Sequence, residues 1–387
     1  MLALLRWFIV FGLPALVHAE PSSGELALMQ TVVAHSRSTS NQTSASLQRQ
    51  TNSVIDKIVF VRLHKVGSST LSSILRRYCD VREKNCFVGP PAMTATASNL
   101  ESIIADFQSR MLPPLDIFQN HVVMNTILLN ALIPGNFKIA LFRTPLSRTM
   151  SAFRHVSGSK WVNSMMASLM NNLYTNCSGA PLGSFDDAMM LMSDQVSPEQ
   201  VDDLDFVMLT EEYDLSLMML RRKLGWSMVD MLYRRQRDNH EAELVSASEA
   251  FEEYLSQPLH ALNEATQLYL QNCIGGDESR VYQLASRAFH AQWEALSADE
   301  QREVKSDESR FSAAQDLLEE CCSNNRSDSY CKGLLEHDGQ WTMRYLQENR
   351  DFSTMRFNSP SVPTIVTLDS SCKSLAEAAL SSSAAEA

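Results

Sequence analysis

The sequence lacks several features that would place it in a common class of protein. After residue 19, no stretch is apolar enough to cross a membrane, which takes about 20 apolar residues. The G-x-x-x-x-G-K-[ST] motif is absent, which argues against a nucleotide triphosphate loop. Lys and Arg (33) are outnumbered by Asp and Glu (45), and the net charge of −12 argues against a general nucleic-acid or polyanion binder.

Two long stretches of this acidic chain lack carboxylates. No Asp or Glu lies between Asp56 and Asp80, and none lies between Asp116 and Asp186. Basic residues occur in both stretches; they are Lys57, Arg62, Lys65, Arg76 and Arg77 in the first, and Lys138, Arg143, Arg148, Arg154 and Lys160 in the second. A local excess of positive charge in an acidic protein is typical of a focused anion site, and it predicts one here.

The first of these stretches contains the pattern around which the chain is organised. Residues 58–63 are mostly apolar and β-prone, so they predict a buried strand. A turn containing Lys65 and Gly67 follows, and then a helical pattern begins. The free N–H groups at a helix start favour a phosphate, and Lys65 adds a full positive charge. Hydroxyl groups at the helix start can donate further hydrogen bonds; they belong to Ser68, Ser69 and Thr70.

A histidine follows the next strand that carries chemistry. Residues 115–118 predict this strand, and His121 comes just after it. Open α/β sheets bind their ligands at the carboxyl ends of strands. A lone histidine is more often structural, but this one lies between two candidate phosphate segments. An imidazole that titrates near neutrality can serve as a general base.

The second carboxylate-free stretch contains another strand followed by a helix. Residues 139–142 predict a buried strand that delivers Arg143 to its carboxyl end. Pro145 ends the strand and can start the next helix, because its ring fixes φ and it lacks an N–H. Ser151 lies eight residues after Arg143. Arginine suits planar, bidentate recognition of a phosphate, so this segment predicts a second phosphate contact.

Together these segments resemble the Golgi carbohydrate sulfotransferases, and within that superfamily the galactose 3-O-sulfotransferase family. The order His-Lys-x-Gly-Ser-Ser-Thr at 64–70 resembles the 5′-phosphosulfate loop of the family. Arg-x-Pro followed by a serine, at 143–151, resembles its 3′-phosphate segment. Residues 206–233 and the Tyr–Phe–Trp pattern within 277–296 are similar to the same family. The resemblance covers roughly residues 57 to 296.

The chain departs from the family pattern at three positions. Val66 stands where a threonine is common, which leaves the loop one hydroxyl short. Thr144 stands where an acid usually follows the arginine, and Leu215 also replaces an acid. We expect the change at Thr144 to be tolerated, because that residue does not supply the phosphate contact. Glu211 and Asp214 fit the family pattern.

The resemblance implies a carbohydrate sulfotransferase with an α/β, P-loop-like fold, in which helices flank a mostly parallel central sheet and the C-terminal region is helical. The donor implied is 3′-phosphoadenosine 5′-phosphosulfate, with no metal. The residues that would hold its 5′ end are Lys65, Gly67, Ser68, Ser69 and Thr70, and those for its 3′-phosphate are Arg143 and Ser151. His121 would remove the acceptor proton, and Lys65 would stabilise the departing oxygen. The acceptor implied is the 3-hydroxyl of galactose on a glycolipid or glycan, which places the chain in glycolipid biosynthesis.

Two alternatives stay open, and a third lacks the residues that it would need. A uronic acid 2-O-sulfotransferase would use the same donor on a polysaccharide. Its acidic acceptor would then contact a group of basic residues, Arg234, Arg235 and Arg237. The other interpretation of these arginines is a solvated basic face. A non-catalytic sulfotransferase-like binding protein would keep the fold and lose Lys65 or His121, but both are present. A phosphotransferase using ATP would need the motif lysine and a carboxylate for Mg²⁺, which the basic stretches lack.

The N-terminal part carries a targeting segment. Residues 1–19 predict a signal peptide or a short membrane anchor, because Arg6 precedes an apolar run and small residues near Ala19 suit cleavage. Either one places the rest of the chain in the secretory lumen. The resemblance implies the Golgi lumen, with the chain membrane-anchored (type II) or soluble after cleavage. Glycosylation sequons at Asn41, Asn176 and Asn325 fit this compartment.

Composition divides the remainder of the chain. Residues 20–56 are rich in Ser, Thr, Gln and Asn and predict a flexible stem. A sulfotransferase domain is expected over 57–310, followed by a cysteine-containing extension over 311–373. The Ala- and Ser-rich residues 374–387 predict a disordered tail.

Eight cysteines in an oxidising compartment predict disulfides. Cys79 and Cys86 can close a short local loop. Four more are expected to brace the C-terminal part in a pairing that the sequence leaves open; they are Cys321, Cys322, Cys331 and Cys372. A zinc site using Cys321, Cys322, Cys331 and His337 is the alternative, although the spacing matches no common ligand pattern.

Overall fold

The structure is a computed structural model of the chain. It describes residues 55–82, 84–88, 94–109, 111, 114–156, 191–234, 254, 261–270, 272, 276–325, 328–334 and 370–382. All of these belong to one compact unit, Val54–Ala387. Several features of the sequence lie outside the described residues; they are the targeting segment, nearly all of the stem, Arg235, Arg237, His337 and the sequons at Asn41 and Asn176.

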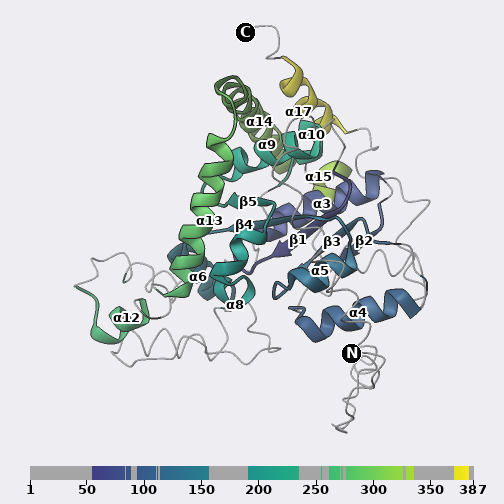
Figure 1. Cartoon of the computed structure of the whole chain (residues 1–387). Coiled ribbons are helices and arrows are strands. Elements are labelled where there is room, and N and C mark those ends of the chain that lie inside the picture. Colours follow the sequence, from purple (N-terminus) through teal and green to yellow (C-terminus); the bar gives the residue numbers. More distant parts are fainter. Residues whose placement is uncertain are drawn as a thin grey trace, which may run out of the picture. The chain divides into compact units, whose positions relative to one another are not determined.

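An all-parallel sheet of five strands forms the centre of this unit (Figure 1). Its strands are β1 (Ile58–Arg62), β2 (Cys86–Val88), β3 (Ile117–His121), β4 (Phe137–Phe142) and β5 (Phe206–Leu209), and their order is β2-β3-β1-β4-β5. Every residue of β1, β3 and β5 is buried, as expected for parallel strands covered on both faces. The prediction of an α/β fold with a parallel central sheet flanked by helices is confirmed.

Strand β1 lies in the middle of the sheet, and the strand order reverses there. Helix α3 (Ser68–Arg82) carries the chain from β1 toward the edge strand β2. Helix α5 (Thr126–Leu132) connects β3 to β4, and these two strands are the neighbours of β1 in the sheet. Strand β4 continues into α6 (Pro145–Val156). In open parallel sheets, ligands bind outside the carboxyl ends of the strands at such a reversal. The fold therefore favours a ligand at the carboxyl ends of β1 and β4.

Further helices surround the sheet. They are α4 (Ala97–Ser109), α8 (Met192–Gln195), the 3-10 helix η2 (Pro198–Asp203), α9 (Tyr213–Leu224), α10 (Met228–Met231), α12 (Glu264–Tyr269), α13 (Asp277–Glu294), α14 (Ala298–Asn324), α15 (Ser329–Leu334) and α17 (Ser371–Ser382). Helix α13 packs against β5, and α14 packs against α9 and α17. Val281, Ala285 and Phe289 are buried at helical spacing along α13. The described parts of the C-terminal region are helical, as expected.

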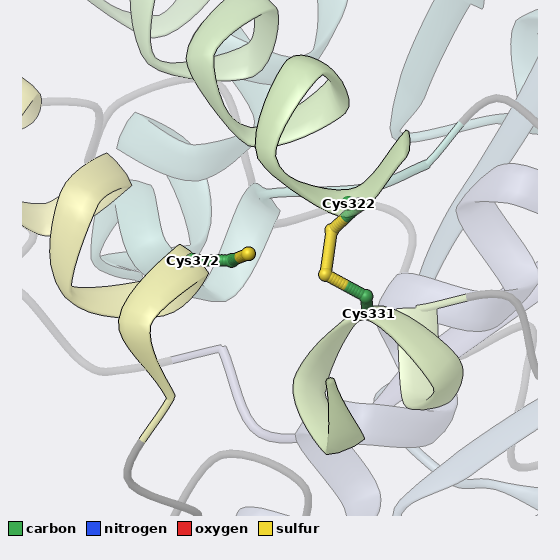
Figure 2. A group of neighbouring side chains, drawn as sticks. All are labelled: Cys322, Cys331 and Cys372. Carbon is green, nitrogen blue, oxygen red and sulfur yellow. A yellow bond between two sulfur atoms is a disulfide. The ribbon is translucent and has the colours of Figure 1, made fainter. Parts of the chain in front are cut away.

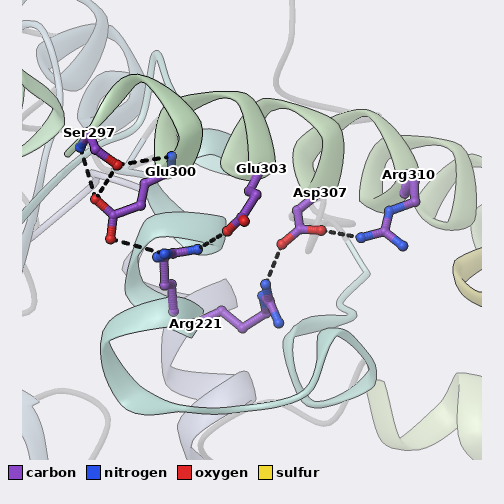
Figure 3. A network of polar contacts seen from close by, with 7 residues as sticks. Arg221, Ser297, Glu300, Glu303, Asp307 and Arg310 are labelled. Atoms are coloured by element: carbon purple, nitrogen blue, oxygen red, sulfur yellow. Dashed lines mark hydrogen bonds and ion pairs between the residues drawn. The ribbon is translucent and has the colours of Figure 1, made fainter. Parts of the chain in front are cut away.

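Helix α14 is held against α9 by charged side chains (Figure 3). Arg222 contacts Glu303 at 2.6 Å and Glu300 at 3.0 Å, and Arg221 pairs with Asp307. Ser297 caps the start of α14 through a capping box with Glu300. The exposed pairs of Arg222 contribute about 0 to 1 kcal/mol each, so they orient α14 more than they stabilise the fold. The expected domain boundary at residue 310 falls inside this continuous helix.

Three disulfides brace the described residues. Cys79–Cys86 joins α3 to β2, which confirms the predicted local loop. Cys322–Cys331 joins α14 to α15, and Figure 2 shows Cys372 pointing toward that bridge from α17. Cys372 itself is bonded to Cys321, which joins α17 to α14. The zinc alternative is wrong for these cysteines, because a sulfur in a disulfide is not available as a thiolate ligand.

The C-terminal tail differs from its prediction. Residues 371–382 form helix α17, whereas disorder was expected from residue 374 onward. Cys372, Ala376 and Leu380 are buried at helical spacing against the rest of the fold. Alanine favours a helix, and the disulfide at Cys372 fixes its start against α14. Among the described residues, no helix combines the length and the apolar character needed to span a membrane.

Candidate functional site

The loop between β1 and α3 has an unusual backbone. Lys65 has a φ of 61° and Gly67 a φ of 84°. Glycine adopts such angles readily, but for Lys65 the left-handed region costs about 1–2 kcal/mol. The Ser68 hydroxyl donates to the carbonyl oxygen of Leu63 at 2.9 Å and closes the turn. Strain of this kind at a non-glycine residue is more common at functional sites than elsewhere.

The helix that follows the loop begins with no acidic residue in its first turn. Ser68 is buried, whereas Ser69 and Thr70 are partly exposed. Arg62, at the end of β1, donates from Nη2 to the Ser69 hydroxyl at 3.2 Å. Burial lowers the pKa of Arg62 to about 10, so its guanidinium stays charged at neutral pH. The helix dipole, Arg62 and Lys65 together give the start of α3 a positive potential.

The two candidate phosphate segments meet at this edge of the sheet. Arg143 Nη1 donates to the carbonyl oxygen of Lys65 at 3.4 Å, although 78 residues separate them in the chain. Thr210, just beyond β5, donates from its hydroxyl to the carbonyl oxygens of Val66 at 2.5 Å and Phe142 at 3.0 Å. The loop after β1 is therefore joined directly to the carboxyl ends of β4 and β5.

Ser151 lies on the helix that Arg143 precedes. It falls in the second turn of α6 and is partly exposed. The first turn of α6 contains no acidic residue, but the Thr144 N–H donates to Glu211 Oε1 at 2.7 Å. Glu211 thus supplies a carboxylate next to Thr144. Tyr282 donates to the other oxygen of Glu211 at 3.3 Å. The pKa of Tyr282 is raised to about 12, mainly by burial and secondly by the charge of Glu211.

His121 ends β3, where its backbone pairs with Arg62 of β1. Its Nδ1 lies 3.1 Å from the carbonyl oxygen of Arg62. Because a carbonyl oxygen can only accept, Nδ1 carries the hydrogen, and Nε2 of the neutral ring holds the lone pair. Burial lowers the pKa of His121 well below 6.5, with Arg62, His64 and Lys65 adding to that shift. His121 is therefore neutral at physiological pH and has one basic nitrogen.

A second histidine stacks on the first. The ring centroids of His64 and His121 are 3.8 Å apart, and the planes differ by 3°. His64 Nε2 lies 2.8 Å from the hydroxyl of Thr94, and both residues are buried. His64 directly precedes Lys65, so the stack joins the loop between β1 and α3 to His121, the candidate base. The sequence motif contained His64, but nothing in the sequence indicated this contact.

A pocket of about 480 Å³ opens beside the loop, on the side of β5. Its lining consists of Gly67, Thr70, Thr210, Glu211, Glu212, Tyr213, Asp214, Tyr233 and Glu308. Tyr233 donates to Asp214 Oδ1 at 2.8 Å. Since β3 and β5 lie on opposite sides of β1, the pocket and His121 flank the loop from opposite sides. The carboxylates in this lining suit hydrogen-bond donors, and Gly67 and Thr70 form its border with the loop.

Several basic residues of the two carboxylate-free stretches have structural roles. Arg76 is buried and donates to Ser72, and Arg77 donates to the carbonyl oxygens of Asp230 and Leu232. Both side chains lie on the buried face of α3. The prediction that the whole stretch serves an anion is therefore wrong for Arg76 and Arg77.

Basic residues of the second carboxylate-free stretch also pair with carboxylates away from the candidate site. Arg148 forms a buried ion pair with Glu278 at 2.7 Å, which joins α6 to α13. Lys138 lies 3.8 Å from Asp205, outside the candidate site. Arg234, considered earlier as an acceptor contact, pairs with Glu319 at 3.1 Å. Among the described side chains, the cations at the carboxyl edge of the sheet are Arg62, Lys65 and Arg143. Lys160 and the side chain of Arg154 lie outside the described residues.

No model of a known protein family matches the chain, and no curated protein matches it in sequence.

Proposed function

We propose that this protein transfers a sulfuryl group from 3′-phosphoadenosine 5′-phosphosulfate to a carbohydrate hydroxyl, and that its sheet is a P-loop-like sulfotransferase fold. The observation that carries the proposal is the contact between Arg143 and the Lys65 backbone. It brings a strained, glycine-containing loop and a phosphate-binding arginine to one edge of the sheet. A nucleotide with phosphates at both its 5′ and 3′ positions needs two such groups side by side.

The donor would lie along this edge with its reacting end toward β3. Its 5′-phosphosulfate would rest on Lys65 and the residues that begin α3; these are Gly67, Ser68, Ser69 and Thr70. Arg143 would bind the 3′-phosphate, with Ser151 as a second contact. The nucleoside would extend toward the acidic pocket, where the amino group of adenine can donate to a carboxylate. This orientation leaves the sulfur on the side of His121.

The reaction would then need positioning and charge stabilisation more than covalent chemistry. The acceptor oxygen forms a bond to sulfur while the bond between sulfur and the phosphate oxygen breaks. His121 Nε2 takes the acceptor proton, and the Lys65 ammonium stabilises the negative charge on the departing oxygen. The products are a sulfate ester and 3′-phosphoadenosine 5′-phosphate.

The acceptor that we propose is the 3-hydroxyl of galactose on a glycolipid or glycan, and the compartment is the Golgi lumen. Three disulfides among the described residues support an oxidising compartment. The pair between Arg234 and Glu319 leaves that arginine less suited to a uronate, so it does not favour the 2-O-sulfotransferase alternative.

Incubation of the purified lumenal part with labelled donor tests the proposal. The acceptor panel comprises galactolipids, galactose-terminated glycans and uronate polysaccharides. We expect label on the galactose-containing acceptors and none on the uronates. Label on the uronates alone would contradict the acceptor assignment, and label on none of them would contradict the enzymatic assignment.

A further inference from the structure

A buried glutamine connects the loop between β1 and α3, which we call the phosphate loop, to the strand that carries His121. Gln195 ends α8 and is buried, and its carboxamide bonds to three backbone groups in two separate segments of the chain. Its Oε1 accepts from the N–H of His64 at 2.9 Å. Its Nε2 donates to the carbonyl oxygens of Arg62 at 3.0 Å and Val122 at 3.3 Å. This orientation is required, because the flipped amide would place its oxygen against two carbonyl oxygens.

One of these carbonyl groups also orients the candidate base. The carbonyl oxygen of Arg62 accepts from Gln195 and from His121 Nδ1, so both of its lone pairs are used. At its other end, the carboxamide holds His64, whose ring stacks on His121. Gln195 thus contacts both groups that determine where His121 lies relative to Lys65.

The backbone around Gln195 is itself anchored. The N–H of Met124, beyond β3, donates to the Gln195 carbonyl oxygen at 2.7 Å. The N–H of Ser193 donates to Glu278 Oε2 at 3.1 Å, and Glu278 is held by its buried ion pair with Arg148. Because α8 is fixed at both ends, its glutamine can act as a rigid spacer.

We propose that Gln195 is a positioning residue that sets the separation between the phosphate loop and His121. The effect of Gln195 on catalysis rests on the proposed function. In-line transfer needs the acceptor oxygen and the sulfur in near-contact, so the separation between the loop and His121 affects the rate. A displacement of about 1 Å in such an arrangement can cost on the order of 100-fold in rate. Gln195 touches neither donor nor acceptor in this account and acts through His121 and His64.

Gln195→Met tests this role, since methionine has a similar volume and makes none of the three hydrogen bonds. We expect kcat to fall by about 10- to 100-fold, as for other residues that orient a reacting group. The affinity for 3′-phosphoadenosine 5′-phosphate should change little, because Lys65 and Arg143 remain.

Gln200 provides a matched control on the same segment. Its Oε1 accepts from the Ser197 N–H at 2.9 Å, and its Nε2 donates to the carbonyl oxygen of Met124 at 2.9 Å. Neither bond reaches the loop or His121. Gln200→Met should therefore lower thermal stability as Gln195→Met does, but should keep the wild-type kcat.

A second readout does not depend on transfer. Parallel stacking should shift the ring-proton resonances of His64 and His121 upfield in histidine-labelled protein. Gln195→Met should move both sets toward their unstacked positions, and Gln200→Met should leave them unchanged. If the wild-type protein transferred no sulfuryl group, the proposed function would fail while this measurement still decided the role of Gln195.

Gln195→Glu covers the case in which the methionine variant does not fold. A carboxylate keeps the acceptor for the His64 N–H but cannot donate to the two carbonyl groups when ionised. We expect kcat to be reduced at about pH 8 and partly restored toward pH 6, where a buried carboxyl group is protonated and donates again. The proposal is overturned if Gln195→Met matches Gln200→Met in kcat and in ring shifts, or if Gln195→Glu matches the wild type throughout this pH range.

Discussion

The imidazole rings of His64 and His121 stack face to face, with centroids 3.8 Å apart and planes within 3° of parallel. Two imidazolium charges at that separation would repel strongly, so the stack favours the neutral form of His121. Burial and the neighbouring Arg62 act in the same direction on its pKa. The arrangement keeps a proton acceptor available next to a loop that is rich in positive charge.

The pH dependence of transfer should reflect this environment. Since the pKa of His121 lies well below 6.5, we expect kcat to stay level as the pH falls from about 8 to 6.5 and to decline only at lower pH. His121→Gln should abolish transfer while donor binding persists. A kcat that already declines by half near pH 6.5 would contradict the neutral, buried base.

Stability should depend on pH through the same group. Between the lowered pKa of folded His121 and the ordinary value of 6.5, the unfolded chain binds more protons than the folded chain. The free energy of unfolding should therefore decrease as the pH falls below about 6.5, and this group should have no effect above that pH. Urea denaturation at several pH values measures the slope. The His121→Gln variant should show a flatter dependence, and an identical slope would assign the proton uptake to other groups.

Two substitutions at Lys65 separate its charge from its backbone conformation. Lys65→Ala and Lys65→Gly should both lower kcat by about 100- to 1,000-fold, because each removes the ammonium group. At a φ of 61°, the glycine variant should be more stable than the alanine variant by about 1 kcal/mol. Denaturant titrations and donor turnover measure the two effects. Turnover near the wild-type rate in either variant would refute the role of Lys65.

Two glycines with similar backbone angles allow a matched comparison. Gly67 (φ 84°) lies in the loop, and Gly135 (φ 70°) lies away from it, between α5 and β4. A Cβ at Gly67 would meet its nearest atoms at 3.8 Å, and at Gly135 it would meet none within 4 Å. Substitution by alanine should therefore cost about 1 kcal/mol at each site through the backbone alone. Calorimetry should show weaker binding of 3′-phosphoadenosine 5′-phosphate for Gly67→Ala only; equal binding by both variants would exclude the loop from the ligand site.

The disulfides should differ in how much they stabilise the fold. Cys321–Cys372 spans 51 residues of sequence, and Cys79–Cys86 spans 7. In the chain-entropy account, the longer loop gives about 1.8 kcal/mol more stabilisation. Paired serine substitutions followed by urea denaturation compare the two. A larger loss on removal of Cys79–Cys86 would indicate that native contacts, rather than loop entropy, dominate.

Local patterns were sufficient to predict much of the fold. The strand at 58–62, the glycine turn and the helix from Ser68 follow from short-range periodicity and turn chemistry, and all three are present. The Cys79–Cys86 bridge also follows from a short spacing. Helix α17 was missed because a run of Ala and Ser has the composition of a disordered tail. The buried disulfide at Cys372 that anchors this helix is a long-range contact.

The candidate site was less accessible to prediction for the same reason. Gln195, Thr94 and Thr210 contribute only through partners between 30 and 144 residues away in the chain. Arg76 and Arg77 were wrongly grouped with Lys65, because proximity in sequence does not say which face of a helix a side chain occupies. Whether a basic residue serves a ligand or the core is decided by packing, which composition does not reveal.

The central claim is that Lys65 and Arg143 hold opposite ends of one nucleotide. Calorimetry with two ligands, 3′-phosphoadenosine 5′-phosphate and adenosine 5′-phosphate, tests it most directly in the wild type, Lys65→Ala and Arg143→Ala. We expect Lys65→Ala to weaken the binding of both ligands and Arg143→Ala to weaken only the ligand that carries a 3′-phosphate. Equal losses for both ligands in Arg143→Ala, or no loss in either variant, would contradict the account.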